Sequence, residues 1–341
     1  MRSEAQSHQE LLRRLAAAAT LLRETPIIRL EHEPVDLYAK LEFLNGVGSI
    51  KDRPAFWMLK RAIERGQVGP GTTIIESSSG NLARSLATFC EILELPFIPV
   101  IDPLVSPLYE SFLRAHCKTV VKVTEGDSGG YLQARLQVVK RLLSGLAGAS
   151  YWPNQYANPD ASEAHYLLTA GEICRALPDV DYVFIGVGSA GTVAGVSRRL
   201  KEHNPGIRII AVDADGSVAF GQPAKMRSIP GLGSSIRPPL LDHAVIDDVV
   251  IVKETETIVA CHQLLERHGQ FVGGSSGTVY SAIRRYFPGR IRGRRPRVLF
   301  LCCDRGDAYR HSIYADLTTR ATPSARVPAT HRGAEEGRPA T

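Results

Sequence analysis

The amino-acid sequence predicts an α/β protein with mostly parallel sheets. Apolar, β-rich runs alternate with stretches of helical periodicity along most of the 341 residues, an order typical of this class. Most of the apolar runs are continuous rather than alternating, which indicates strands buried on both faces and covered by helices. A chain of this length can also bury a substantial core and form two lobes.

Short apolar runs rich in β-branched and aromatic residues are the predicted strands. They span residues 37–43, 72–76, 97–101, 119–123, 182–187, 207–212, 248–252 and 297–302. Longer stretches with helical periodicity are the predicted helices. They span residues 54–65, 82–93, 107–116, 131–146, 162–176, 193–203, 255–268 and 279–287. Residues 318–341 are rich in Pro, Ala, Gly, Thr and charge, so we expect a disordered tail there.

The composition is that of an ordinary globular protein, with 44% apolar and 22% charged residues. No run approaches the ~18 apolar residues of a membrane span, and the N-terminus lacks the apolar core of a signal peptide, so we expect a cytoplasmic protein with no membrane partner. The net charge of +6 comes partly from arginines at 290–297. No aromatic residues accompany them, which favours a solvated loop over a nucleic-acid site. The six cysteines lack metal-ligand spacing, so no metal is expected.

A lysine at a strand-to-helix turn is the first candidate for chemistry. Lys51 lies in Gly-Ser-Ile-Lys-Asp-Arg, residues 48–53, between a predicted strand and a predicted helix. The small residues before it allow the amine to enter a cleft, where partial desolvation favours the neutral form that Schiff-base chemistry requires. A solvated surface lysine is the alternative, and the loops that follow decide between them.

Three polar loops follow Lys51, namely Glu-Ser-Ser-Ser-Gly-Asn at 76–81, Gly-Val-Gly-Ser-Ala-Gly-Thr at 186–192 and Gly-Gly-Ser-Ser-Gly-Thr at 273–278. The loop at 186–192 follows a predicted strand and opens a helix, so its amides and the helix dipole favour phosphate. An ordinary turn, or a fragment of a dinucleotide site, is the alternative. The loop at 76–81 also favours an anion, although N-capping by Ser79 or Asn81 explains the same residues.

In this order the four segments resemble the fold-type II pyridoxal-phosphate enzymes, the family of cysteine synthase and cystathionine β-synthase, over about residues 20–315. The resemblance implies a tryptophan synthase β-like fold with pyridoxal 5′-phosphate in the cleft between two lobes. Residues 1–47 and 156–317 would form the larger lobe, which binds the cofactor phosphate. Residues 48–155 would form the smaller lobe, which carries Lys51 and the substrate-carboxylate loop. A homodimer acting on small amino acids is also implied.

The resemblance further assigns roles to individual residues. Lys51 would hold the cofactor as an imine and act as the catalytic base, and Asn81 would bond the ring oxygen. Ser275 would face the pyridine nitrogen, with Ser276 as the chemical alternative. The cofactor phosphate would bind at the glycine loop, at Gly188, Ser189, Ala190, Gly191 and Thr192. The substrate carboxylate would bind at Ser78, Ser79, Gly80 and Gln155.

Four segments are similar to those of a subgroup of the family, the N-(2-amino-2-carboxyethyl)-L-glutamate synthases of siderophore biosynthesis. They are Glu-Ser-Ser-Ser-Gly-Asn-Leu at 76–82, Asn-Gln-Tyr-Ala-Asn at 154–158, Asp-Ala-Asp-Gly-Ser at 213–217 and Asp-Arg-Gly-Asp at 304–307. Cysteine synthases usually carry Phe where this chain has Tyr156, whose phenol can bond a polar substrate. Arg135 can bind a phosphate bidentately, or else it is an exposed helix arginine. Gly188 stands where some members of the subgroup have Ser.

The resemblance therefore implies β-replacement on O-phospho-L-serine or O-acetylserine through α-aminoacrylate, with the amino group of L-glutamate as nucleophile. The product would be N-(2-amino-2-carboxyethyl)-L-glutamate, a precursor of 2,3-diaminopropionate for siderophores or peptide antibiotics. A cysteine synthase using sulfide is the nearest alternative, ahead of a threonine or serine dehydratase. A non-catalytic regulatory or binding protein of the same fold is the alternative from another class, which the presence of Lys51, Asn81 and Ser275 disfavours.

Overall fold

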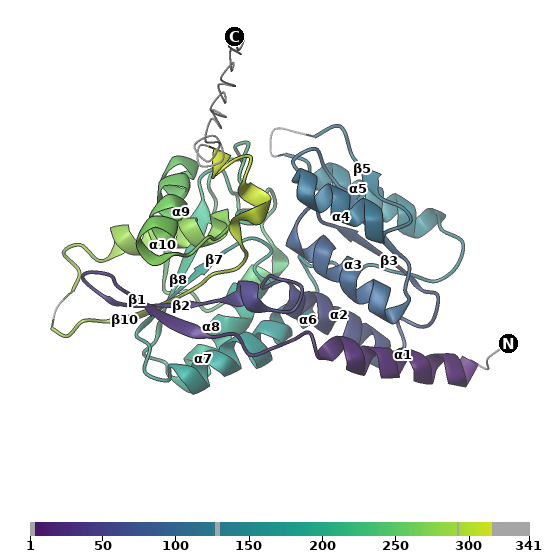
Figure 1. The fold of residues 1–341 in the computed structure, drawn as a ribbon, viewed down its shortest axis with the longest axis horizontal. Coiled ribbons are helices and arrows are strands. Elements are labelled where there is room, and N and C mark those ends of the chain that lie inside the picture. The colour runs from purple at the N-terminus through teal and green to yellow at the C-terminus, as the bar shows by residue number, and fades with distance from the viewer. Residues whose placement is uncertain (1–3, 127–129, 292, 316–341) are drawn as a thin grey trace, which may run out of the picture.

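The computed structural model describes residues 4–126, 130–291 and 293–315. The tail expected at 318–341 lies outside these residues. Two α/β lobes stand side by side, each built around its own sheet (Figure 1). The predicted α/β class with mostly parallel sheets is confirmed, because helices pack against both sheets.

Within the described residues, the larger lobe holds a six-stranded sheet in the order β1-β2-β10-β7-β8-β9. β1 and β2 pair antiparallel, and the other neighbouring strands are parallel. Most residues of β10, β7 and β8 in the middle of this sheet are buried, as their continuous apolar sequences predict. The strands are β1 (Ile27–Leu30), β2 (Asp36–Lys40), β7 (Tyr182–Gly186), β8 (Arg208–Ala214), β9 (Asp248–Val252) and β10 (Arg297–Leu301).

The smaller lobe, over the same described ranges, holds a four-stranded parallel sheet in the order β5-β4-β3-β6. Its strands are β3 (Thr73–Ser77), β4 (Phe97–Ile101), β5 (Val121–Lys122) and β6 (Ser150–Tyr151). The α-helices of the two lobes are α1 (Glu4–Ala19), α2 (Asp52–Glu64), α3 (Asn81–Leu93), α4 (Pro107–His116), α5 (Leu132–Gly145), α6 (Pro159–Ala164), α7 (Ala170–Ala176), α8 (Gly191–His203), α9 (Glu254–His268) and α10 (Gly274–Tyr286). None of these helices has the length and apolar character that crossing a bilayer requires.

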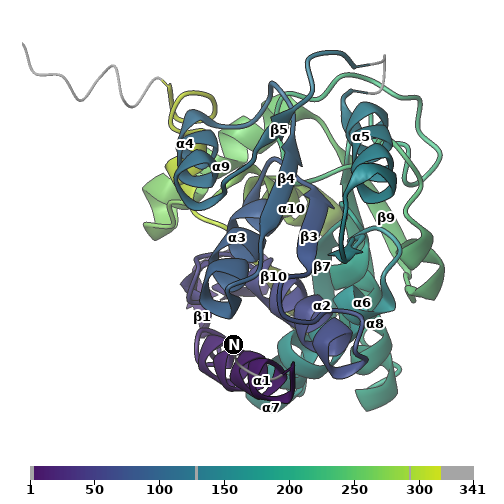
Figure 2. The same cartoon turned by 90° about the vertical axis from the view of Figure 1, so that its right-hand side faces the viewer.

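Helix α1 corrects the division expected at residue 47. It packs on α2 and α3 of the smaller lobe, below them in Figure 1 and at the lower edge in Figure 2. Its apolar face, Leu11, Leu15 and Ala18, is buried, and Arg14 forms an ion pair with Glu94 at the end of α3. The assignment of all of residues 1–47 to the larger lobe is therefore wrong for α1, because the apolar face of this helix is covered by the smaller lobe.

Two predicted elements end differently in the structure. The strand expected at 37–43 stops at Lys40, where its pairing with β10 ends, and the chain enters a 3-10 turn at Glu42–Leu44. The helix expected at 162–176 is interrupted by a π-helical stretch, His165–Thr169. There the His165 imidazole bonds the Thr169 hydroxyl at 3.0 Å and faces Thr192 of α8, so a tertiary contact accompanies the break in the helix.

A buried cluster of charged side chains ties α2 to the larger lobe. The Arg53 guanidinium donates to Glu42 Oε2 at 2.7 Å and to Glu172 Oε1 at 2.6 Å. The Lys40 amine donates to Glu172 Oε2 at 2.5 Å and to the Thr25 carbonyl at 2.9 Å. Two cations therefore balance two carboxylates where water is excluded. Arg53 lies two residues after Lys51, in the first turn of α2, so the cluster holds this turn in place.

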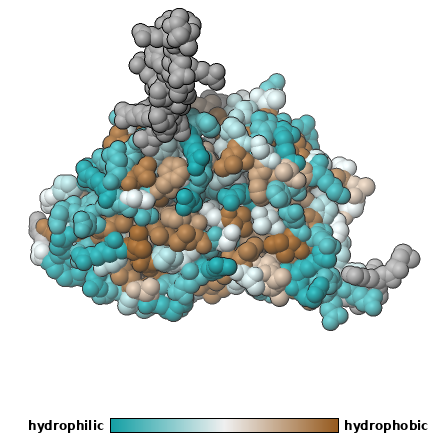
Figure 3. Space-filling model, viewed as in Figure 1, coloured by the Kyte–Doolittle hydropathy of each residue, from teal (hydrophilic) through white to brown (hydrophobic). Residues whose placement is uncertain are grey.

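Polar and apolar residues are unevenly spread over the face that carries both lobes. Figure 3 shows hydrophilic residues around the outer edges of this face and apolar residues gathered toward its middle. The lobes meet in this middle region (Figure 1), and residues of both lobes line a shared cavity.

Candidate active site

A cavity of about 250 Å³ lies between the two lobes and brings the predicted loops together. The smaller lobe contributes the start of α2, the serine loop before α3 and part of α5. The larger lobe contributes the glycine loop before α8, the start of α10 and the segment 226–235. The predicted residues that line it are Lys51, Ser78, Ser79, Gly80, Asn81, Arg135, Gln155, Tyr156, Gly188, Ser189, Ala190, Thr192 and Ser275. Gly191 lies beside a smaller adjoining cavity instead.

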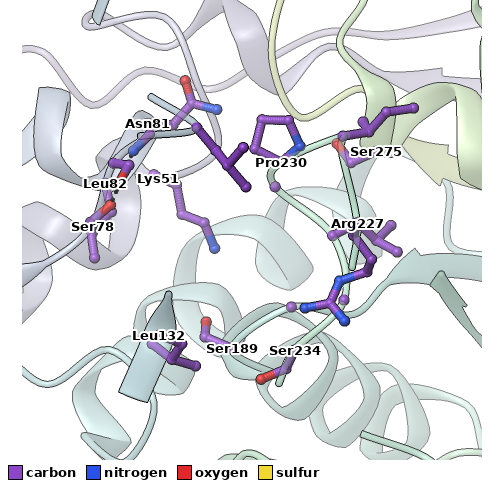
Figure 4. Close-up of a pocket in the computed structure, with 18 of the residues that line it drawn as sticks. Lys51, Ser78, Asn81, Leu82, Leu132, Ser189, Arg227, Pro230, Ser234 and Ser275 are labelled. Atoms are coloured by element: carbon purple, nitrogen blue, oxygen red, sulfur yellow. Dashed lines mark hydrogen bonds between the residues drawn. The ribbon is translucent and has the colours of Figure 1, made fainter. Parts of the chain in front are cut away.

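Lys51 occupies the N-cap position of α2 and extends its amine into the cavity (Figure 4). Gly48, with φ of 112°, permits the turn that precedes it. The buried Asp52 carboxylate accepts hydrogen bonds from the Val47 and Gly48 amides at 2.8 and 3.0 Å and holds this turn closed. Burial lowers the pKa of the Lys51 amine, against the opposing effect of nearby acidic groups including Asp304. The neutral amine is thereby favoured, as a nucleophile or base requires.

The Asn81 side chain is held at both ends. Its Oδ1 accepts a hydrogen bond from the Tyr109 hydroxyl at 2.6 Å, and its Nδ2 donates to Asp304 Oδ2 at 2.7 Å. The same carboxylate oxygen accepts from the Tyr309 hydroxyl at 2.8 Å. These contacts fix the orientation of the amide and use one of its two N–H bonds, so the other N–H can serve a ligand in the cavity.

N-capping does not explain Ser79 or Asn81 of the serine loop, although the Ser78 hydroxyl satisfies an amide in the first turn of α3. Gly80 is the N-cap of α3, and the Ser79 hydroxyl accepts instead from the Asp102 amide at 2.9 Å and from Arg135 at 3.3 Å. Ser78 accepts from the Ala83 amide at 3.2 Å. The capping alternative is therefore wrong for Ser79 and Asn81, whose side chains serve the cavity and its walls.

Arg135 belongs to the cavity rather than to an exposed helix face. Its side chain is 12% exposed, and its Nε lies 3.2 Å from Asp102 Oδ2. The Tyr156 phenol lines the same cavity, and burial raises its pKa, an effect that Arg135 partly opposes. A neutral phenol donor and a guanidinium therefore stand on one wall, which suits an anionic substrate.

The glycine loop has the geometry of a phosphate cradle at the start of α8. Ala190 adopts a left-handed conformation with φ of 67°, which turns successive amides toward one side. A side chain at Gly188 would begin 3.4 Å from the Gly231 carbonyl, so the loop passes close to its neighbour. The Thr192 hydroxyl lies 3.2 Å from His165 Nε2, and burial lowers the pKa of His165, which keeps the imidazole neutral. These residues fit the phosphate group of pyridoxal phosphate.

The structure separates the two serines of the third loop. Ser276 is completely buried, and its hydroxyl accepts a hydrogen bond from the Cys303 amide at 3.1 Å. Ser275 lines the cavity at the start of α10 (Figure 4). Of the two chemically equivalent hydroxyls, the one at Ser275 can reach a ligand.

Sequence reasoning did not select several residues of this cavity. Tyr109, Tyr309 and Arg227 line it, and Asp304 was noted only within a subgroup motif. Their signal in the sequence is weak, because single tyrosines and arginines are common in loops. Only their contacts with Asn81 and their position at the cavity identify them as residues of the site.

Glu76 provides a pH-dependent test of how the serine loop is built. Its buried carboxyl accepts from the Ser77 amide at 2.8 Å and from Trp152 Nε1 at 3.2 Å, and burial raises its pKa to about 7 from an ordinary 4.5. The unfolded chain therefore ionises first, and the free energy of unfolding should fall as pH rises from 4.5 to 7, by up to about 3 kcal/mol. Glu76→Gln should remove this slope. Urea unfolding across the interval measures it.

The difference in slope between the wild type and Glu76→Gln is the quantity that counts, whatever the absolute stability of the variant. Glu163→Gln is the matched control, since that side chain is 40% exposed, and it should keep the wild-type slope. Parallel pH profiles for the wild type and Glu76→Gln would show that Glu76 does not titrate in this range.

The two lobes and the lysine-bearing cavity define a class, the enzymes of pyridoxal-phosphate fold type II. Residues 18–304 match the family described as pyridoxal-phosphate dependent enzyme, and the chain belongs to this family. It is 43% identical over 324 residues to the N-(2-amino-2-carboxyethyl)-L-glutamate synthase of Ralstonia nicotianae, with 89% of this chain and 95% of that protein covered. It is 42% identical over 299 residues to the synthase of the same name from Cupriavidus metallidurans, with 86% and 87% covered.

Solved structures show the same fold. The O-acetylserine dependent cystathionine β-synthase of Helicobacter pylori superposes with a TM-score of 0.78 at 29% identity, covering 86% of this chain and 96% of that one. A hydrogen sulfide-producing enzyme of Fusobacterium nucleatum gives a TM-score of 0.79 at 27% identity, with 86% and 98% covered. The chain is thus a pyridoxal-phosphate-dependent enzyme of the cysteine synthase-like type.

Proposed function

We propose that this enzyme makes N-(2-amino-2-carboxyethyl)-L-glutamate by β-replacement on O-phospho-L-serine or O-acetyl-L-serine, with the amine of L-glutamate as nucleophile. The observation that carries the proposal is the similarity, over most of the chain, to two synthases with this name. A cavity walled by Arg135, Tyr156 and hydroxyl groups suits substrates with several anionic groups. The proposal includes a homodimer in the cytoplasm that supplies 2,3-diaminopropionate for siderophore or antibiotic synthesis.

Each group of residues in the cavity has a separate role in the proposed reaction. Bound pyridoxal phosphate withdraws electrons from the α-carbon of the amino acid, which makes its proton acidic and lets the β-substituent leave. Lys51 anchors the cofactor and then takes and returns the α-proton. Asn81 orients the ring, and Ser275 offers the pyridine nitrogen a neutral hydroxyl. The phosphate binds at Gly188–Thr192, and the substrate carboxylate binds at Ser78–Gly80 and Gln155.

Product analysis tests the proposal directly. The enzyme is mixed with O-phospho-L-serine or O-acetyl-L-serine, and each mixture receives L-glutamate, sulfide or both. The proposal expects the glutamate adduct, identified by mass, to dominate when both nucleophiles are present. If cysteine forms rapidly and the adduct does not, the enzyme is a cysteine synthase.

Tyr156→Phe should affect the second half of the reaction selectively. Loss of one hydrogen bond to the amino-acid nucleophile should slow its addition about 3- to 10-fold. Release of phosphate or acetate from the first substrate should stay close to the wild-type rate. Rapid mixing with the first substrate, followed by addition of glutamate, separates the two steps.

The control for this variant is Tyr166→Phe, whose hydroxyl contacts Glu202 on the surface, outside the residues that line the cavity. Both steps should be unchanged in the control. Equal slowing of both steps in Tyr156→Phe would mean that the phenol does not act on the nucleophile.

A further inference from the structure

The larger lobe places a second guanidinium in the cavity. Arg227 lies in the segment 226–235 between β8 and β9, and it lines the cavity together with Pro230 and Ser234. Figure 4 shows it across the cavity from Ser78 and Asn81, with its guanidinium turned toward Ser234. Arg135 comes from α5 of the smaller lobe, so the cavity has one arginine from each lobe.

The Arg227 side chain is held in place by neutral groups. Its NH1 donates to the Gly216 carbonyl at 2.6 Å, and its NH2 donates to Ser235 Oγ at 3.1 Å. Gly233 leaves room for it, because a side chain at that position would begin 3.0 Å from the Arg227 Nε. The segment itself is anchored just beyond, where the Ser228 and Ile229 amides both donate to Glu254 Oε1 at 2.7 Å. The guanidinium is therefore pre-positioned rather than free to swing.

The two arginines differ in how their charge is balanced. Arg135 is paired with Asp102. Arg227 is half-buried, and its contacts in the described part of the chain include no ion pair with a carboxylate. Burial lowers the pKa of Arg227, although Asp213, Glu254 and Tyr156 oppose this effect. A half-buried guanidinium that forms no ion pair with a carboxylate of the described residues and lines a cavity favours an anionic ligand.

The chemistry of the proposed reaction indicates which anion this is. The first substrate's carboxylate is assigned to the serine loop on the opposite wall. The amine of the nucleophile must approach the reacting carbon near Lys51, which leaves the side-chain carboxylate of the dicarboxylic amino acid as its outermost charged group. A planar guanidinium binds a carboxylate through two parallel hydrogen bonds.

We infer that Arg227 is a specificity-determining residue that binds the side-chain carboxylate of the second substrate, an α-amino dicarboxylic acid. This inference rests on the proposed function. It explains why the cavity holds two guanidinium groups, which serve two anionic substrates from opposite lobes. It also predicts discrimination between L-glutamate and its neutral isostere L-glutamine, since only the former pairs with Arg227.

Arg227→Met tests the assignment. Because a hydrogen-bonded charge pair is lost, the KM for L-glutamate should rise about 10- to 100-fold, while release of phosphate or acetate from the first substrate stays within about 3-fold. The preference for glutamate over glutamine should collapse. Calorimetric titration of the protein with L-glutamate should show a matching loss of affinity that does not depend on turnover. Arg227→Lys keeps the positive charge but not the planar guanidinium, so its KM for L-glutamate should lie between those of the wild type and Arg227→Met. It also provides a test if the methionine variant does not fold.

Arg237→Met is the matched control. Arg237 lies two residues after this segment, outside the residues that line the cavity, and pairs with Asp242. Its side chain is 56% exposed, so its loss should change none of these quantities. An unchanged KM and an unchanged preference for glutamate in Arg227→Met would overturn the inference while leaving the proposed function intact. Slower release from the first substrate would also overturn it, since Arg227 would then bind that substrate's leaving group. A wild type that uses sulfide and not glutamate would instead overturn the proposed function, and the inference with it.

Discussion

Lys51→Ala should lower kcat for β-replacement about 10⁴-fold, because the attachment point of the cofactor and the base for the α-proton are lost together. The cofactor absorbance near about 410 nm, which reports covalent attachment to an amine, should disappear as well. Borohydride reduction of the wild type, followed by peptide mapping, should place the pyridoxyl label on Lys51. The measurement therefore has a spectroscopic and a chemical readout besides turnover.

Lys60→Ala is the control, since Lys60 lies on the same helix and pairs with Glu64 at the surface. It should retain absorbance, label and activity. A label on Lys60, or on the buried Lys40, would show that a different lysine carries the cofactor. Lys40 already donates to Glu172 and Thr25, so its amine is not available without disrupting the cluster around Arg53.

Arg53→Met should destabilise the protein by about 3–5 kcal/mol, because it leaves two buried carboxylates with one cation between them. Glu42 and Glu172 lose the hydrogen bonds of 2.7 and 2.6 Å that the guanidinium supplies. Methionine matches much of the volume, so the loss of charge rather than a cavity should dominate. Urea unfolding at neutral pH measures the effect.

Arg61→Met on the same helix serves as the comparison, because that side chain is 36% exposed and its ion pairs with Glu64 and Glu163 are at the surface. Its contact with the buried Asp160 is 3.9 Å long, and Asp160 remains paired with Arg65 at 2.6 Å. It should cost at most about 1 kcal/mol. Adding Glu42→Gln and Glu172→Gln to Arg53→Met should recover part of the stability, since the uncompensated charges are then removed. A stability of Arg53→Met equal to that of Arg61→Met would mean that the cluster contributes little.

The strand pattern was readable wherever strands are long and buried. The prediction at 97–101 coincides with β4, because a continuous apolar run is stable inside a covered sheet. The prediction at 248–252 coincides with β9, although this edge strand is only partly buried. Strand β6, Ser150–Tyr151, is too short to show a period. Helix α1 was not predicted. The structure shows that its apolar face is buried against α3.

The positions of the polar loops were also partly predictable from the sequence. Apart from Gly191, the residues chosen around Lys51, Asn81 and the glycine loop line one cavity. Each loop follows the carboxyl end of a strand, and these strand ends from the two sheets face the same cavity. The choice between Ser275 and Ser276, however, depended on a hydrogen bond from the Cys303 amide that took one hydroxyl out of reach.

By itself, the sequence determined the α/β class, the order of the loops and the family, because these follow from local periodicity and from residues close together in the chain. The tertiary structure decided which side chains meet. Asp304 reaches Asn81 across 223 positions, and Glu172 reaches Arg53 across 119. Arg227 faces the cavity because its segment is anchored on Glu254 of α9. Such contacts depend on the packing of distant elements, and burial then sets their charge and reactivity.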